Sequence, residues 1–123
     1  MSIRIKRIYD PFLKADGQRV LVDRLWPRGV KKGDARLSLW MKGVAPSPEL
    51  RRWFNHDPEH WQGFRKRYTR ELGNKPEEIK KLNELMREDT LTLIYAARDP
   101  IHNHAKVIAD YLVKHDKAYA KNK

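Results

Sequence analysis

Two polar clusters in the sequence contain side chains that could transfer a proton or hold an anion. The first is Asp23-Arg24, followed by Leu-Trp-Pro-Arg-Gly, and the second places Asp99 three residues before His102. Carboxylates and imidazoles are common general acids and bases in catalysis. A guanidinium group binds phosphate or carboxylate through two parallel hydrogen bonds. The sequence therefore predicts an anion site, with Asp23, Asp99 and His102 as candidate catalytic residues.

Candidate ligand-binding residues lie around these two clusters. They are Arg24, Trp26, Arg28, Lys42, Arg98 and Asn103. Trp26 could stack on a planar ligand, and Arg28 lies between a proline and a glycine with little core to join. Each prediction has a structural alternative: Asp23 and Arg24 can close a loop as an ion pair, Trp26 can anchor that loop on the core, and His102 can pack locally.

Three other patterns favour no chemistry. Ser47 precedes Pro-Glu, so a helix N-cap explains it better than a nucleophile does. His56 and His60 have the spacing of a metal-binding pair, but a proline between them starts a helix and separates their faces. His102 and His104 would point in different directions on a helix. Because the chain also has no Cys, we expect no metal site, and the sequence indicates no particular cofactor.

Four segments have the composition of β-strands, namely residues 3–9, 19–23, 39–44 and 90–97. The last is almost continuously apolar, which favours a strand buried on both faces at the centre of a parallel sheet. Ligands of open α/β sheets bind beyond the carboxyl ends of the strands. Both polar clusters follow such strand ends, so parallel strands would bring them to one edge of the sheet.

Four helices are predicted from their start signals and apolar spacing. Ser47, Asp57 and Asp99 each precede a proline that can occupy the first helical position. A fourth helix is predicted from Pro76 to about Arg87, with its apolar residues on one side.

The order of these elements predicts the fold class. We expect an α/β protein with a single compact domain over residues 1–118, followed by a Lys-rich tail over residues 119–123. A small, mostly parallel sheet of about four strands would be flanked by about four helices in Rossmann-like layers. Residues 10–18 are too few for a helical crossover, so the relative direction of the first two strands stays open.

Several segments resemble one known family in order along nearly the whole chain. These are Asp-Arg-Leu-Trp-Pro-Arg-Gly at residues 23–29, Ala-Pro-Ser at 45–47, His-Asp-Pro at 56–58, Leu-Ile-Tyr-Ala-Ala at 93–97 and His-Asn at 102–103. They resemble the YeaO-like branch of the family named domain of unknown function 488. That resemblance implies a small cytoplasmic α/β protein of bacterial type, and it supplies no reaction.

The positive charge of the chain is compatible with more than one function. Twenty-seven Lys and Arg against 16 Asp and Glu leave a net charge of +11, with the excess concentrated in residues 1–44. The leading hypothesis is a site for a phosphate or nucleotide-like ligand, with or without catalysis. The alternatives are a nucleic-acid-binding module that uses the basic surface, and a non-catalytic interaction or regulatory protein. The sequence has no membrane span or signal peptide, which predicts a cytoplasmic protein, and it does not indicate an oligomeric state.

Overall fold

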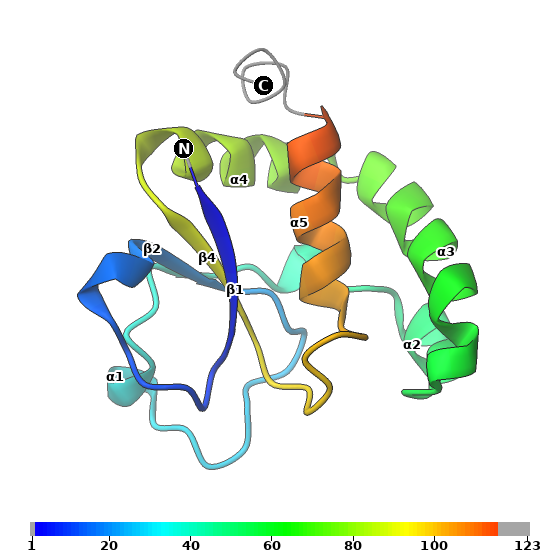
Figure 1. Cartoon of the computed structure of the whole chain (residues 1–123), viewed down its shortest axis with the longest axis horizontal. Helices are drawn as coiled ribbons and strands as arrows, with labels where there is room; N and C mark the ends of the chain where they lie inside the picture. Colours follow the sequence, from blue (N-terminus) through cyan, green and yellow to red (C-terminus); the bar gives the residue numbers. More distant parts are fainter. Residues whose placement is uncertain (1, 116–123) are drawn as a thin grey trace.

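The structure, a computed structural model, describes residues 2–115 and contains a four-stranded parallel sheet (Figure 1). The strands are β1 (Ile3–Arg7), β2 (Gln18–Leu21), β3 (Leu39–Trp40) and β4 (Leu91–Tyr95). Their spatial order is β1-β4-β2-β3, so β4 pairs with both β1 and β2. The predicted α/β class and the central position of the last strand are confirmed. The predicted tail, residues 119–123, lies outside the described residues.

Five α-helices and three short 3-10 helices connect the strands. The α-helices are α1 (Lys32–Ala35), α2 (Pro48–Phe54), α3 (Trp61–Gly73), α4 (Pro76–Glu88) and α5 (His104–His115). The 3-10 helices are η1 (Lys14–Asp16), η2 (Lys42–Val44) and η3 (Pro58–His60). Across the described range, no helix is both long and apolar enough to cross a membrane.

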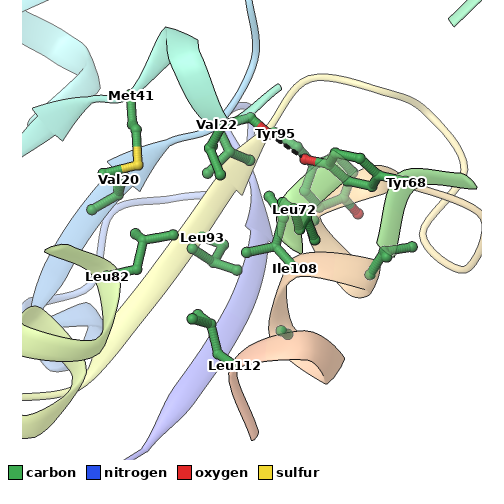
Figure 2. Packing of buried hydrophobic residues seen from close by; sticks show 14 of the residues in the cluster. Val20, Val22, Met41, Tyr68, Leu72, Leu82, Leu93, Tyr95, Ile108 and Leu112 are labelled. Atoms are coloured by element: carbon green, nitrogen blue, oxygen red, sulfur yellow. Dashed lines mark hydrogen bonds between the residues drawn. The ribbon is translucent and has the colours of Figure 1, made fainter. Parts of the chain in front are cut away.

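The main core fills the space between one face of the sheet and helices α2–α5 (Figure 1). Side chains alternate between the two faces of a strand, which directs the following residues of β2 and β4 to this core: Val20, Leu91, Leu93 and Tyr95. Figure 2 shows Val20, Leu93 and Tyr95 with Leu72 of α3, Leu82 of α4 and Leu112 of α5. The Tyr68 hydroxyl, buried in this core, donates a 2.5 Å hydrogen bond to the carbonyl of Val44.

The opposite face of the sheet is covered more thinly, by α1 and the chain around it. Leu21 and Ile94 point to this side and form a small cluster with Ala35 of α1. Trp26 and Trp40 pack on that cluster, with their rings edge to face and their centroids 5.2 Å apart. The layering is therefore uneven, with four helices on one face and one short helix on the other (Figure 1).

A buried ion cluster lies near the amino end of β2. The Asp16 carboxylate accepts hydrogen bonds from Lys6 at 3.0 Å and from Arg19 at 2.6 Å, and Asp16 is fully buried. Burial opposes ionisation of Asp16, but the hydrogen bonds from Lys6, the Leu13 backbone and Arg19 outweigh it and lower the pKa of Asp16. None of these residues belongs to the predicted site, so we assign the cluster a structural role.

All four strands are shorter than predicted, the third most of all, and the last helix begins later than predicted. The third strand, predicted over residues 39–44, ends at Trp40 because residues 42–44 form η2. There the carbonyl of Val44 bonds to Tyr68, and the carbonyls of Gly43 and Ala45 bond to the Lys75 ammonium, so they are unavailable to a neighbouring strand. The last helix begins at His104 and not at the proline after Asp99.

The first two strands are parallel and are not neighbours, which settles the direction that the sequence left open. β4 lies between them and pairs with both in parallel. After β2 the chain passes to the face covered by α1, whereas after β4 it passes to the face covered by α5 (Figure 1). Such a divergence of neighbouring connections opens a crevice beyond the strand ends.

Candidate functional site

A cavity of about 610 Å³ lies beyond the carboxyl ends of β2 and β4. Residues that follow β2 and β4 form part of its wall, and the rest comes from residues 45–46, from α2 and the turn after it, and from Phe64 of α3. The polar lining residues are Asp23, Arg24, Arg51, Arg52, Asn55, His56, His102, Asn103 and His104. Proline, alanine, leucine and phenylalanine side chains provide the apolar part of the lining. A volume of this size suits a ligand considerably larger than a single inorganic ion.

Asp23 is held in place between the two strand ends. Its Oδ2 atom accepts the N–H of Ala96, which follows β4, at 3.1 Å, and its backbone carbonyl accepts the indole N–H of Trp40 at 2.8 Å. The buried Oδ1 atom makes no hydrogen bond within the described chain, and it lies 3.2 Å from Nε2 of His104. The carboxylate therefore retains unused acceptor capacity at the cavity.

His104 completes this arrangement from the first residue of α5. Its Nε2 atom lies 3.1 Å from the carbonyl of Val22 as well as 3.2 Å from Asp23. A carbonyl oxygen can only accept, so Nε2 of His104 carries a hydrogen. The Asp23 and His104 side chains are only 17% and 15% exposed.

Arg24 contributes a guanidinium group to the same wall. Its Nη2 atom donates to the carbonyl of Pro46 at 3.1 Å, which fixes the side chain across the segment that leads into α2. Its Nε–H is buried and makes no hydrogen bond in the part of the chain that the structure describes. A guanidinium has five N–H donors, so Arg24 can bind an anion without losing its contact to Pro46.

His102 is oriented by Asp99 in the turn before α5. The Asp99 carboxylate accepts the backbone N–H groups of Ile101 and His102 at 2.8 and 3.0 Å, and it lies 2.8 Å from Nδ1 of His102. The backbone hydrogen bonds from His102 and Ile101, aided by the His102 side chain, lower the pKa of Asp99 to about 2. Because ionised Asp99 only accepts, Nδ1 of His102 carries a hydrogen.

The same turn explains why α5 begins later than predicted. Asp99 takes the first free N–H groups itself, and Asn103 then accepts the backbone N–H of Lys106 through both its carbonyl and its Oδ1 atom. Asn103 is thus the N-cap of α5. Since His102 precedes the helix and His104 starts it, both histidines line the cavity, although helical geometry over this segment would have separated them.

Helix α2 brings Arg51 and Arg52 to the cavity. Ser47 caps this helix by accepting the N–H of Leu50, and its hydroxyl donates to Glu71 of α3 at 2.6 Å. The predicted cap is confirmed. Both arginines are exposed and line the cavity, whereas their apolar neighbours Leu50 and Phe54 point into the core.

Two predicted ligand-binding residues pack on the opposite face of the sheet. Trp26 donates its indole N–H to the carbonyl of Val30 at 2.7 Å and packs against Trp40, as the loop-anchor alternative describes. The ammonium group of Lys42 lies 4.1 Å from the centre of the Trp40 ring. Neither Trp26 nor Lys42 lines the cavity.

Three further predicted residues also lie outside the cavity lining. Arg28 is exposed, and its carbonyl accepts the hydroxyl of Tyr9 at 3.0 Å. Arg98 is exposed in the turn after β4. Asp99 contacts His102 but does not itself line the cavity. Of the predicted site residues, the structure brings together Asp23, Arg24, His102 and Asn103.

Five residues of the cavity lining were not among the predicted site residues: Arg51, Arg52, Asn55, His56 and His104. One signal for the arginines was available, because a charged pair between apolar Leu50 and Trp53 must lie on the outer face of a helix that follows a strand. His104 was missed because its helix was predicted to begin too early. His56 was considered only with His60 as a metal-binding pair, a role that the proline between them disfavours. Among residues 2–115, no group of three or more His, Cys, Asp or Glu side chains could hold a metal ion.

The chain is similar over most of its length to bacterial proteins of one family. Residues 2–123 match the family described as the inactive DUF488-N3 subclade. The uncharacterised protein YeaO of Escherichia coli is 46% identical over 112 residues, which cover 91% of this chain and 97% of that protein. The uncharacterised protein Rv3073c of Mycobacterium tuberculosis is 42% identical over 110 residues, covering 89% of this chain and 92% of that protein. No solved structure matches. This protein therefore belongs to the DUF488 family.

Proposed function

We propose that the protein binds a small phosphorylated, nucleotide-like molecule in the cavity at the carboxyl end of the sheet, without converting it. The observation that carries this proposal is the charge of the lining, in which three arginines face one cavity with a single carboxylate. Guanidinium groups bind phosphate oxygens through paired hydrogen bonds. The excess of positive charge therefore favours an anionic ligand.

The positions of the arginines support a phosphate at the mouth of the cavity and the rest of the ligand inside it. Arg51 and Arg52 are exposed, and Arg24 is partly buried. Phe54 and Phe64 are buried at 7% and 2% exposure and contribute apolar surface to the lining. An apolar wall beside a few polar groups is typical of sites for organic ligands.

Two observations favour binding over catalysis. The family description that matches the chain is that of an inactive subclade. In addition, the cavity lining within the described chain contains no Ser, Thr, Cys, Tyr or Lys, all of which act as nucleophiles in covalent catalysis. Under this proposal Asp23 and His102 position the ligand, and Asp99 holds His102. Their predicted catalytic roles stay predictions.

Isothermal titration calorimetry at fixed ionic strength tests the proposal. We expect adenosine 5′-monophosphate and inorganic phosphate to bind, and adenosine to bind more weakly. The double variant Arg51→Gln/Arg52→Gln should lose about tenfold or more in affinity for the nucleotide, because charge-assisted hydrogen bonds to phosphate disappear. The control Lys66→Gln/Arg70→Gln removes the same charge from exposed positions of α3 outside the cavity and should leave affinity nearly unchanged.

Two results would contradict the proposal. The first is an absence of binding for both phosphate and the nucleotide. The second is an equal loss in the cavity variant and the α3 control, since that would indicate diffuse attraction to a basic surface. Binding of an oligonucleotide that both variants weaken equally, with a steep dependence on salt, would instead favour the nucleic-acid-binding alternative.

A further inference from the structure

The turn after α2 contains two successive residues in the left-handed backbone region. Asn55 has φ 46° and His56 has φ 52°. Asn55 is explained by helix capping, because helices often end on a left-handed Gly or Asn, and its N–H bonds to the carbonyl of Arg51 at 3.0 Å. Capping does not explain His56. A residue with a Cβ atom is disfavoured at positive φ, and glycine would adopt this conformation at no steric cost.

Packing on both sides of the turn enforces this conformation. Before it, the Phe54 ring stacks on Phe64 with centroids 4.5 Å apart. After it, Asp57 donates its N–H to the carbonyl of Phe54 at 3.0 Å and accepts the N–H of Glu59 at 3.0 Å. Unfavourable backbone conformations persist where the surrounding structure determines them, and they concentrate at binding sites.

The left-handed conformation of His56 occurs at the wall of the candidate site. The residue is exposed and lines the same cavity as Arg51 and Arg52. Its ring is 6.2 Å from that of Phe54, without a hydrogen bond or ion pair in the described chain that would account for the imidazole. An imidazole can donate a hydrogen bond to a phosphate oxygen, and a protonated imidazole adds a positive charge.

We infer that His56 is an anion-binding residue of the cavity, held in a left-handed conformation so that its imidazole meets the phosphate of the ligand. This inference rests on the proposed function and assigns a fourth phosphate-binding side chain to it. It accounts for a histidine at a position where the backbone favours glycine.

The test compares affinity for inorganic phosphate with thermal stability in three variants. His56→Gly and His56→Asn both tolerate positive φ and both remove the imidazole. We expect each to bind phosphate about tenfold more weakly, as for the loss of one charge-assisted hydrogen bond, while the unfolding midpoint stays at or above that of the wild type. Arg36→Gly is the matched control, because Arg36 has φ 49° but does not line the cavity; its affinity should be unchanged.

The outcomes separate the two proposals. If the wild type binds no phosphate, the proposed function fails and the role of His56 fails with it. If the wild type binds phosphate and both His56 variants bind it with wild-type affinity, only the role of His56 is overturned. A fall in both the midpoint and the affinity of the His56 variants would also overturn it, because the histidine would then serve to pack the turn.

Discussion

Asp99 organises one wall of the cavity although it does not line it. Its carboxylate accepts hydrogen bonds from two backbone N–H groups and from the imidazole of His102. These contacts hold the turn before α5 in place and fix the orientation of the His102 ring. These hydrogen bonds favour the ionised form and bring the pKa of Asp99 down to about 2 from an ordinary value of 3.8.

The lowered pKa predicts how Asp99→Asn behaves with pH. A group whose pKa is depressed in the folded state stabilises that state fully above the unfolded pKa, and the contribution is lost as pH falls through the folded pKa. The variant should therefore be less stable than the wild type above about pH 4, and the difference should disappear between pH 3.8 and about 2. Urea unfolding across this range measures it, and a carboxyl NMR titration of Asp99 with a midpoint near pH 4 would contradict it.

Residue chemistry and the positions of the strand ends predicted part of the cavity lining. Asp23, Arg24, His102 and Asn103 were predicted from polar residues that follow strands, and they do share the cavity. Trp26 could not be placed in the same way, because an indole beside a proline suits a loop anchor as well as a ligand. Its hydrogen bond to the carbonyl of Val30 depends on a loop conformation that composition does not encode.

At the scale of elements, α2 must be fixed on α3 for Arg51 and Arg52 to reach the cavity. Trp53 of α2 lies against α3, with its ring stacked on His60 at 4.6 Å and the guanidinium of Arg67 at 4.0 Å from its centre. Gly63 provides the space, since a Cβ atom there would lie 2.6 Å from Cη2 of Trp53.

Gly63→Ala should therefore destabilise the protein. The indole cannot move away easily between His60 and Arg67, so we expect a loss of about 1 to 3 kcal/mol in the free energy of unfolding, typical of overpacking. Gly33→Ala in α1 is the control, because no atom lies within 4 Å of its added Cβ and alanine favours helix. Guanidinium unfolding compares the two, and equal stabilities of the two variants would refute the role of Gly63.

Elements that depend on neighbouring residues could be predicted from the sequence, whereas boundaries that depend on contacts with distant residues could not. The cap of α2 and the apolar run of β4 are encoded by neighbouring residues, and both predictions are confirmed. The early end of β3 depends on Tyr68 and Lys75, which bond to its following carbonyls from elsewhere in the chain. The late start of α5 depends on two acceptors that bind successive backbone N–H groups: Asp99 accepts those of Ile101 and His102, and Asn103 accepts that of Lys106.

At the scale of the molecule, the sheet order determines where the cavity forms. β4 inserts between β1 and β2, so the polar residues after β2 and after β4 become neighbours although more than 70 positions separate them in the sequence. The sequence predicted that strand ends would meet, but not which strands would be adjacent. The net charge of +11 is compatible with a pocket and with a basic surface, of which the sequence favoured the pocket, and the structure concentrates three arginines at one cavity.

Binding of a phosphorylated ligand in this cavity can be observed residue by residue in amide NMR spectra of the ¹⁵N-labelled protein titrated with adenosine 5′-monophosphate. We expect saturable chemical-shift changes concentrated in residues 23–25, 45–56, 96–97 and 102–104, which line or flank the cavity, with α4 unaffected. Shifts spread over the exposed lysines and arginines of the whole surface, or no shifts at millimolar nucleotide, would contradict it.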